Sequence, residues 1–316
     1  GFAFATGMAA VSACFMLLSK GDHIVITEDV YGGTYRFVTK VLPRFGITHT
    51  FVDFTDLQAV RAAVTPETKL IYIETPSNPT LGITDIAGVV EIAQEVGALT
   101  FLDNTFMTPI HQRPLDLGVD VVIHSATKFL SGHSDIVAGL VVTKDPTLSE
   151  QVYFIQNSFG SCLGVQDSFT LIQNMKTTAV RFNESARVAS VLATFLDNHP
   201  LVEKVYYPGL ASHPGADIHA RQSTSAGAVL SFSLPSYDVA KVFVEAMQIP
   251  VFAVSLGGVE SILSYPAKMS HAAMEPEERA KRGITDGLLR FSVGLENEHD
   301  LLEDFAQALE KALQVK

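Results

Sequence analysis

The residues with the clearest chemical potential stand at the ends of two predicted strands. Ser125-Ala126-Thr127-Lys128 directly follows the apolar run Val119–His124, and Asp103 ends the run Leu99–Asp103. These strand ends are expected to be neighbours, which would bring the amine and the carboxylate to one edge of a sheet. Taken alone, a lysine flanked by hydroxyls is most often a solvated loop residue, and an aspartate in this position can be a simple loop cap.

Two further features are expected at the same edge. Thr6-Gly7-Met8 opens an apolar helix, whose first N–H groups are a natural seat for a phosphate. Tyr31-Gly32-Gly33 follows the predicted strand His23–Thr27 and places an aromatic ring at the rim, although a tyrosine there can equally serve in packing. A lysine for a Schiff base, a carboxylate for a ring nitrogen, an aromatic ring and a phosphate seat are together the groups that pyridoxal phosphate requires.

The elements that must position these residues alternate between strands and helices. Asp85–Val96, with apolar residues on one face and Gly97 as a stop signal, is typical of the predicted helices. The predicted strands are short and almost continuously apolar, as strands covered on both faces are. They are His23–Thr27, Ile47–Asp53, Leu70–Glu74, Leu99–Asp103, Val119–His124 and Val137–Thr143. This alternation predicts the α/β class, with a mostly parallel sheet flanked by helices.

The second half of the chain has a different pattern. A helical stretch runs from about Gln166 toward Asn198 without glycine or proline. A strand at Ala228–Leu234 and helices near Ser236–Met247 and Asp300–Leu313 follow it. We therefore predict a large cofactor-binding domain over residues 1–174 and a smaller C-terminal α/β domain over residues 175–316, hinged on the long helix.

Composition excludes several classes of protein. The 316 residues are 47% hydrophobic and 18% charged, with a net charge of −12, which argues against a nucleic-acid or anionic-membrane partner. No apolar run is long enough to span a bilayer. Two cysteines, Cys14 and Cys162, cannot build a disulfide framework, so a reduced, cytoplasmic protein is expected.

Several motifs with known chemistry are absent. The sequence contains no G-x-G dinucleotide fingerprint, no G-x-x-x-x-G-K-[ST] phosphate loop and no G-x-S-x-G nucleophile elbow. Ser125–Lys128 reads as S-x-x-K, the motif of a serine acyl-transfer enzyme, but the S-D-N and K-T-G partners of that class do not occur. His111, His124 and His133 lack ligand spacing, so no metal site is expected.

The sequence resembles the Cys/Met-metabolism family of pyridoxal-phosphate enzymes, whose members carry out trans-sulfuration reactions. The resemblance spans essentially the whole chain and implies the fold type I of pyridoxal-phosphate-dependent transferases. Seven motifs in the family's order carry it. They are FATGMAA (4–10), DVYGGTYR (29–36), ETPSNPTL (74–81), DNTFMTP (103–109), HSATKFLSGHSD (124–135), SLGGVES (255–261) and GLLRFSVGLE (287–296).

The resemblance implies a role for each residue of the expected site. Lys128 would form the Schiff base with pyridoxal 5'-phosphate and act as the catalytic base, and Asp103 would pair with the pyridine nitrogen. Tyr31 would stack on the ring and protonate the leaving thiolate, and Asn78 would reach the phenolic oxygen. The phosphate would be held by Gly7, Met8, Ser125 and Thr127.

Substrate binding is implied for three more residues. Ser255 and Arg290 would bind the α-carboxylate of a sulfur amino acid. Because Arg290 stands in an apolar run, a buried anionic partner is expected for its guanidinium. Val254, before the SLGG motif, would give the pocket an apolar wall that selects neither γ- nor β-elimination.

Members of this family carry a segment before the position of Gly1, including a Tyr-x-Arg pair that reaches the cofactor phosphate of a neighbouring subunit. That segment is absent from this chain. The resemblance implies a homotetramer built from two catalytic dimers. It favours a cystathionine γ-lyase, which forms cysteine, 2-oxobutanoate and ammonia, with β-elimination as a second activity. The alternatives are a cystathionine β-lyase, then a cystathionine γ-synthase or methionine γ-lyase.

Overall fold

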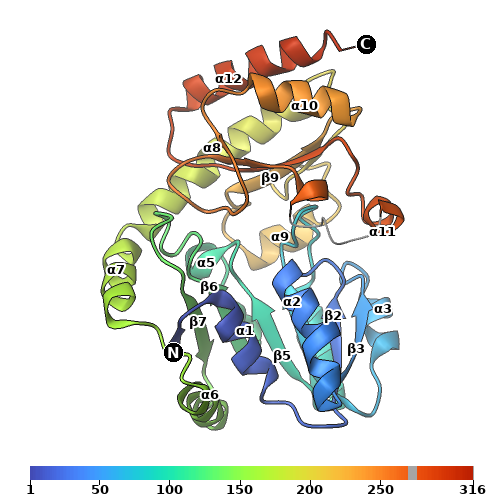
Figure 1. Ribbon diagram of the computed structural model, residues 1–316. Coiled ribbons are helices and arrows are strands. Elements are labelled where there is room, and N and C mark those ends of the chain that lie inside the picture. The colour runs from blue at the N-terminus through green and yellow to red at the C-terminus, as the bar shows by residue number, and fades with distance from the viewer. Residues whose placement is uncertain (270–275, 316) are drawn as a thin grey trace.

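The chain folds around two β-sheets, one above the other in Figure 1. The computed structural model describes residues 1–269 and 276–315. The first half of the chain builds a seven-stranded sheet in the order β1-β7-β6-β5-β4-β2-β3. Its strands are β1 (Phe2–Phe4), β2 (His23–Thr27), β3 (Thr48–Val52), β4 (Thr68–Glu74), β5 (Leu99–Asp103), β6 (Val121–Ser125) and β7 (Gly139–Thr143).

The predicted parallel sheet is confirmed for five of its seven strands. β3, β2, β4, β5 and β6 pair in parallel, whereas β7, near the other edge, pairs antiparallel with both β6 and β1. The sequence analysis missed β1, because three residues at a sheet edge are too few to show a periodic pattern. The order of the strands reverses at β2, so that a crevice forms beyond the carboxyl ends of β2 and β4.

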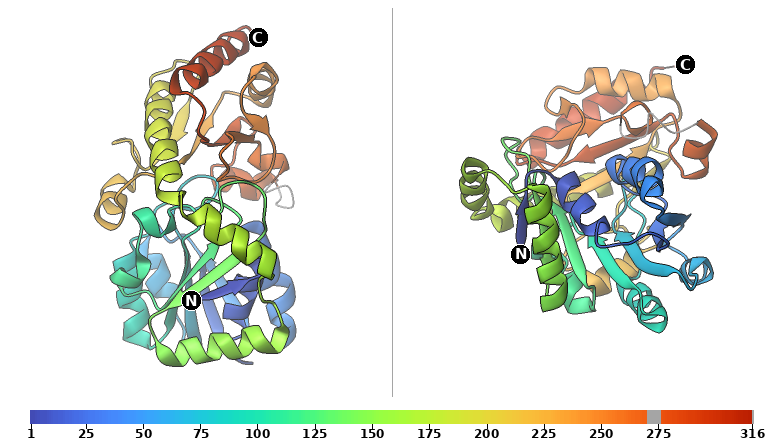
Figure 2. Two further views of the ribbon diagram at one scale, coloured as in Figure 1. Left: turned by 90° about the vertical axis from the view of Figure 1, so that its left-hand side faces the viewer. Right: turned by 60° about the horizontal axis from the view of Figure 1, so that its bottom comes forward.

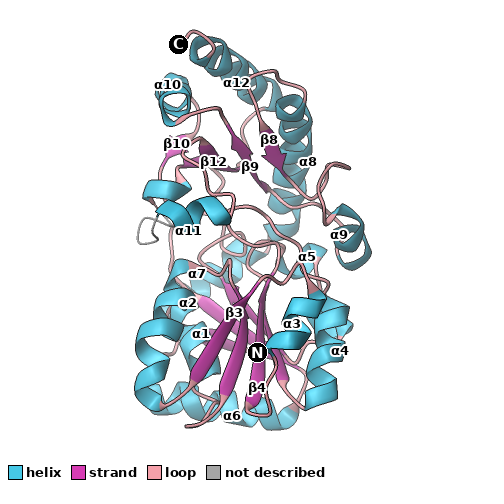
Figure 3. Cartoon of the chain, turned by 90° about the vertical axis from the view of Figure 1, so that its right-hand side faces the viewer, coloured by secondary structure: helices cyan, strands magenta, loops and turns pink. Residues whose placement is uncertain are grey.

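Helices cover both faces of this sheet, which explains why its strands are apolar throughout (Figure 3). On one face α1 (Gly7–Phe15) and α6 (Pro146–Phe159) enclose a core with Phe15, Tyr72 and Phe101. On the other face α3 (Leu57–Ala63) and α4 (Ile86–Val96) enclose a second core. Several short helices complete this half. They are α2 (Gly32–Arg36), a π-helical turn at Phe37–Val41, a 3-10 turn at Leu42–Phe45, α5 (Thr108–His111) and a 3-10 turn at Pro114–Leu117.

The second half of the chain forms a five-stranded sheet in the order β10-β11-β12-β9-β8. Aromatic side chains including Phe232, Phe243, Phe291 and Phe305 pack its core against the helices. The strands are β8 (Lys204–Tyr206), β9 (Val229–Ser233), β10 (Val251–Phe252), β11 (Ile262–Ser264) and β12 (Leu288–Ser292). The helices are α7 (Val165–Met175), α8 (Thr178–Asp197), α9 (Ala216–Gln222), α10 (Tyr237–Ala246), α11 (Pro276–Lys281) and α12 (Glu298–Ala312).

The single long helix predicted from Gln166 to Asn198 is wrong. The chain instead forms α7 and α8, separated by Lys176 and Thr177. At the break, the N–H groups of Lys176 and Thr177 bond three residues back, to Gln173 and Asn174, and the axis changes direction (Figure 2). Tertiary contacts of the first turn of α8 outweigh helix propensity here, because Thr178 donates a hydrogen bond to Leu130 O from the segment after Lys128.

Candidate active site

A cavity of about 560 Å³ opens where the carboxyl ends of the central strands meet the loops of the second sheet. It lies at the crevice that the strand order predicts. The structure brings every predicted site residue to its lining, although these residues come from positions 7 to 290 of the chain. They are Gly7, Met8, Tyr31, Asn78, Asp103, Ser125, Thr127, Lys128, Val254, Ser255 and Arg290.

Lys128 follows β6 and extends its amine toward the second sheet. Its Nζ donates a hydrogen bond to Ser255 Oγ at 2.6 Å. Burial lowers the pKa of Lys128 from its ordinary 10.5 to about 8, and the positive charge of Arg290 adds to that effect. A sizeable fraction of this amine is therefore neutral near neutral pH, as a nucleophile or a base must be.

Two buried carboxylates meet at the floor of the cavity. Glu74 and Asp103 end neighbouring parallel strands and lie directly opposite each other in register. Burial raises the pKa of both groups, and the charge of Asp103 raises the pKa of Glu74 further, to well above its usual range. Thr105 opposes the shift at Asp103 because its backbone N–H and its hydroxyl both donate to Asp103 Oδ1, at 3.0 and 2.5 Å. Of the two groups, Glu74 is therefore the one whose protonated form burial favours more, and Thr105 favours the negative charge on Asp103.

Glu74 also fixes the position of Tyr31, which the sequence analysis did not foresee. The backbone N–H of Tyr31 donates to Glu74 Oε2 at 2.9 Å. The tyrosine ring packs over Gly33, where a Cβ would lie 2.5 Å from its Cε1 and 2.7 Å from Met8 Sδ. The position of Glu74 at the end of a predicted strand, next to Asp103, was the signal that could have identified it.

The start of α1 forms an anion seat between β6 and the cavity. Thr6 caps this nine-residue helix by accepting from Ala9 N–H, and the first two residues of the helix, Gly7 and Met8, line the cavity. Glycine is required at position 7 because a Cβ would lie 2.8 Å from Ser125 Oγ. Thr127 lines the same corner, but its hydroxyl donates to Ala138 O and accepts from Ala138 N–H.

Arg290 lies buried on β12 at the opposite wall. Its guanidinium donates to Asn78 Oδ1 at 2.9 Å, to Ser255 O at 2.6 Å and to Ser264 Oγ at 3.2 Å. These acceptors are neutral, so the expected buried anionic partner is not a residue of the described chain. The Nε of Arg290 is buried without a hydrogen-bond partner in the described structure. Burial lowers the pKa of Arg290 to about 10, and an anionic ligand would compensate both the charge and this unpaired donor.

The rim of the cavity is formed by less buried side chains. Val254 is 63% exposed and Tyr31 is 48% exposed. Ser255 adopts a left-handed conformation with φ of 88°, which directs the backbone so that its carbonyl meets Arg290 and its hydroxyl meets Lys128. Arg36 of α2 also lines the cavity. Sequence reasoning gave it no role, although it belongs to the same motif as Tyr31.

The three histidines that sequence reasoning considered for a metal have separate contacts. His111 contacts Thr224 and Asn183, His133 contacts Ser131 O, and His124 is buried in β6. Within residues 1–269 and 276–315, no group of three histidine, cysteine, aspartate or glutamate side chains is placed to hold a metal ion. In the same part of the chain, no helix is long and apolar enough to cross a membrane.

Together these groups define an enzyme that binds a phosphorylated, electron-withdrawing cofactor through a lysine. The model of the Cys/Met metabolism PLP-dependent enzyme family matches residues 1–310, and the chain belongs to this family. The protein is therefore a pyridoxal-phosphate-dependent carbon–sulfur lyase with the type I fold.

Similar proteins share nearly the whole chain. The sequence is 64% identical to a cystathionine beta-lyase of Bacillus subtilis over 311 residues, which are 98% of this chain and 80% of that protein. It is 50% identical to a cystathionine gamma-lyase of the same organism, over 98% of this chain and 82% of that protein. The crystal structure of cystathionine gamma-lyase from Lactobacillus plantarum, complexed with L-serine, superposes with a TM-score of 0.96 at 47% identity, over 99% of this chain and 82% of that chain.

The cavity fits pyridoxal phosphate. The N–H groups of Gly7 and Met8 suit its phosphate, the carboxylate of Asp103 suits its ring nitrogen, and the amine of Lys128, with its lowered pKa, suits its aldehyde. When bound, this cofactor supplies an electron sink for the charge that develops when the α-proton of an amino acid is removed. Substrate binding and proton transfer would be carried out by the side chains of the cavity.

Proposed function

We propose that this protein is a cystathionine β-lyase, rather than the γ-lyase that the family resemblance first favoured. The observation that carries this proposal is the identity of 64% to a protein named cystathionine beta-lyase, against 50% to a gamma-lyase from the same organism. Both proteins are compared over 98% of this chain, so the difference does not arise from coverage.

The proposed reaction breaks the bond between sulfur and the β-carbon of cystathionine. The amine of Lys128 removes the α-proton, and the electron pair left on the α-carbon expels the thiolate from the β-carbon. The thiolate takes up a proton to give homocysteine, for which the exposed phenol of Tyr31 at the cavity rim is a candidate donor. Hydrolysis of the remaining three-carbon unit gives pyruvate and ammonia. One proton abstraction suffices, whereas γ-elimination needs a second one at the β-carbon.

The other cavity residues bind and orient in this proposal. Arg290 and Ser255 hold the α-carboxylate, which supplies the anion that the buried guanidinium lacks. Asp103 would pair with the cofactor's ring nitrogen, and Asn78, already bonded to Arg290, would reach the cofactor's phenolic oxygen. Val254 offers the distal part of the substrate an uncharged surface.

The two eliminations are separated by their keto acids. Purified protein loaded with pyridoxal phosphate is incubated with cystathionine, and pyruvate and 2-oxobutanoate are quantified in one digest. We expect pyruvate and homocysteine to predominate, and Lys128→Ala protein gives the background. A predominance of 2-oxobutanoate would show that the protein is a γ-lyase, and the absence of both keto acids would reject cystathionine as the substrate.

Val254 provides a sharper version of the same experiment. A carboxylate at this position would pair with the distal ammonium of cystathionine in only one orientation of the substrate. Val254→Glu should therefore raise the ratio of 2-oxobutanoate to pyruvate by about one to two powers of ten, which is the contribution expected from one ion pair in a partly desolvated cleft. Val254→Gln is the matched control, because it adds the same bulk without charge. An equal shift in both variants would remove the charge argument.

We further propose that copies of this chain associate, as the family resemblance implies, into a homotetramer of two catalytic dimers. Figure 2 shows α6 and α7 together on one face of the molecule. Large apolar side chains of these two helices are exposed, as is expected where a second copy docks. They are Phe154 (68%), Phe159 (66%), Val165 (89%), Phe169 (59%) and Ile172 (60%). Light scattering at working concentration tests the proposal, and an active monomer would contradict it.

A further inference from the structure

Arg181, outside the cavity, makes an unusual set of contacts with the segment that follows Lys128. It stands in the first turn of α8 and is only 8% exposed. Its Nη1 donates to Phe129 O at 3.2 Å, and its Nη2 donates to Leu130 O at 3.3 Å. These are the carbonyls of the two residues directly after Lys128. The guanidinium therefore holds the main chain of the lysine segment rather than any side chain of it.

The remaining donors of Arg181 bond to the break between α7 and α8. Nη2 also donates to Asn174 O at 3.1 Å, and Nε donates to Thr177 Oγ1 at 3.0 Å. All of these acceptors are neutral. Burial lowers the pKa of Arg181, and the negative charge of Asp135 opposes this effect. A buried cation held only by neutral acceptors is costly, so its presence calls for a role that an apolar side chain could not fill.

Gly132 shows how closely the arginine approaches this segment. A Cβ at Gly132 would lie 1.7 Å from Arg181 Nη1, and the residue has φ of +73°. The N–H of Gly132 in turn donates to Lys128 O at 2.7 Å. The turn that carries Lys128 is thus closed within itself and held from outside by the guanidinium. If this turn moved, it would lose the hydrogen bond from Gly132 N–H to Lys128 O or those from Arg181 to Phe129 O and Leu130 O.

The opposite side of the same turn is also tightly packed. A Cβ at Gly257 would lie 2.7 Å from Phe129 N and 3.0 Å from Lys128 C. The loop with Ser255, whose hydroxyl accepts from Lys128 Nζ, therefore presses against the lysine main chain. Lys128 is held between this loop and Arg181, so a small shift on the arginine side changes where the amine lies.

We propose that Arg181 is a positioning residue for the reaction: it fixes the main chain after Lys128 so that the amine lies at the cavity in contact with Ser255. Arg181 contacts neither cofactor nor substrate in this proposal and acts only through Lys128. The inference rests on the proposed role of Lys128 as the cofactor-binding lysine.

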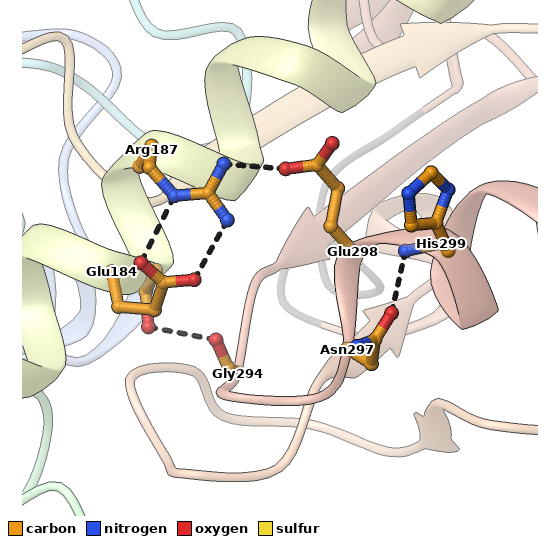
Figure 4. Close-up of polar contacts among 7 residues, drawn as sticks. Glu184, Arg187, Gly294, Asn297, Glu298 and His299 are labelled. Carbon is orange, nitrogen blue, oxygen red and sulfur yellow. Dashed lines mark hydrogen bonds and ion pairs between the residues drawn. The ribbon is translucent and has the colours of Figure 1, made fainter.

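The test compares two arginines of the same helix. Arg181→Met keeps most of the apolar stem and removes every hydrogen-bond donor. Arg181→Lys keeps the positive charge but lacks the planar guanidinium, with its several N–H donors. Arg187→Met is the matched control, because Arg187 lies on the exposed side of α8, where it pairs with Glu184 and Glu298 (Figure 4). For each protein, Tm, kcat, KM and the rate of acylation of Lys128 in the cofactor-free protein are measured, the last by peptide mass spectrometry.

We expect Arg181→Met to lower kcat by roughly tenfold to a hundredfold, as a small misplacement of a reacting group does, while KM changes little. The acylation rate of Lys128 should change in the same protein, and Arg181→Lys should fall between it and wild type. Arg187→Met should match wild type in kcat and in acylation. If Arg181 served only to stabilise the fold, Arg181→Met would lower Tm but would change neither the acylation rate of Lys128 nor kcat relative to KM.

A folded Arg181→Met protein with wild-type kcat and wild-type Lys128 acylation would overturn the proposal. If Arg181→Met does not fold, Arg181→Lys decides, because unchanged kcat and acylation in that variant would equally overturn it. Failure of the proposed role of Lys128, on which this inference rests, would be seen differently. In that case Lys128→Ala would retain cofactor binding and turnover, whereas the acylation measurement needs no cofactor and still reports on Arg181.

Discussion

Two groups of charged residues in this molecule use the same side-chain types in opposite surroundings. In the cavity, Arg290 is 4% exposed and Lys128 lies beside it, and burial lowers the pKa of both. On the outer side of α8, the side chain of Arg187 is 53% exposed and pairs with Glu184 and Glu298 (Figure 4). There the pKa of Arg187 is raised by its hydrogen bonds to the two carboxylates.

The two groups differ in how completely each charge is paired and hydrated, and this difference separates reactive charges from charges that only stabilise the fold. At the surface each charge is matched by an opposite one, and water screens the pair, so it contributes little to either stability or reactivity. In the cavity the charges are desolvated and incompletely matched, and their protonation therefore responds to a ligand. If this comparison is correct, substitutions in the cavity change reactivity strongly, whereas those at the surface cluster change only stability, and only slightly.

The largest effect is expected for Lys128→Ala. The substitution should abolish turnover and the visible absorbance of bound cofactor, since no other amine in the described cavity lining is available as base or nucleophile. Lys144→Ala is the control, because Lys144 pairs with Asp116 in an exposed ion pair. Turnover and the absorbance spectrum are compared at equal protein concentration. Retention of the band by Lys128→Ala would show that another lysine carries the cofactor.

Asp103→Asn should give the next largest effect. The amide keeps the size of the side chain but removes the negative charge that would pair with the cofactor's ring nitrogen, so kcat should fall roughly a hundredfold or more, as for other preorganised electrostatic contacts. Cofactor should still bind, because Lys128 and the start of α1 are unchanged. Asp120→Asn, at another strand edge where Thr100 contacts the carboxylate, is the control. A near-normal kcat in Asp103→Asn would remove the assigned role.

The third prediction concerns the pH at which Lys128 reacts. Only the neutral amine is a nucleophile, so acylation of Lys128 in the folded, cofactor-free protein should rise with pH and be half-maximal near pH 8, its lowered pKa. In protein unfolded by denaturant the midpoint should move up toward the ordinary lysine value of 10.5. Peptide mass spectrometry after short pulses of reagent measures both. Coincident midpoints in folded and unfolded protein would contradict the desolvation argument.

Much of this site was predictable because its residues follow strand ends. Lys128 and Asp103 stand directly after continuous apolar runs, and the order of parallel strands then brings them together without any detailed geometry. Thr6 before an apolar helix likewise predicts the cap that the structure shows. Family resemblance was needed for Asn78 and Arg290, since nothing local to those residues indicates a cavity.

Other parts of the molecule could not be predicted from the sequence, for physical reasons. The break between α7 and α8 arises from hydrogen bonds to carbonyls about fifty residues earlier, and every residue has a carbonyl, so no side-chain pattern marks them. Glu74 is a partial case: its strand-end position beside Asp103 marks its place in the cavity, but nothing marks its contact with the backbone N–H of Tyr31. A side chain that acts through main-chain contacts leaves its signal at neither end of the interaction.

The smallest effects are expected at the surface cluster, where the comparison can be sharpened between two adjacent residues. Asn297 caps α12 by accepting from the N–H of His299 at 2.8 Å, and Glu298 pairs with Arg187 (Figure 4). Asn297→Ala should lower the free energy of unfolding by about 1 kcal/mol, the usual worth of a helix cap. Glu298→Gln should lower it by less, because the ion pair is screened by water and salt while the cap is a local hydrogen bond. Neither substitution should change kcat. Denaturant unfolding at low and high salt measures both, and a loss for Glu298→Gln that exceeds that for Asn297→Ala and persists at high salt would show that this exposed pair behaves like the buried charges of the cavity.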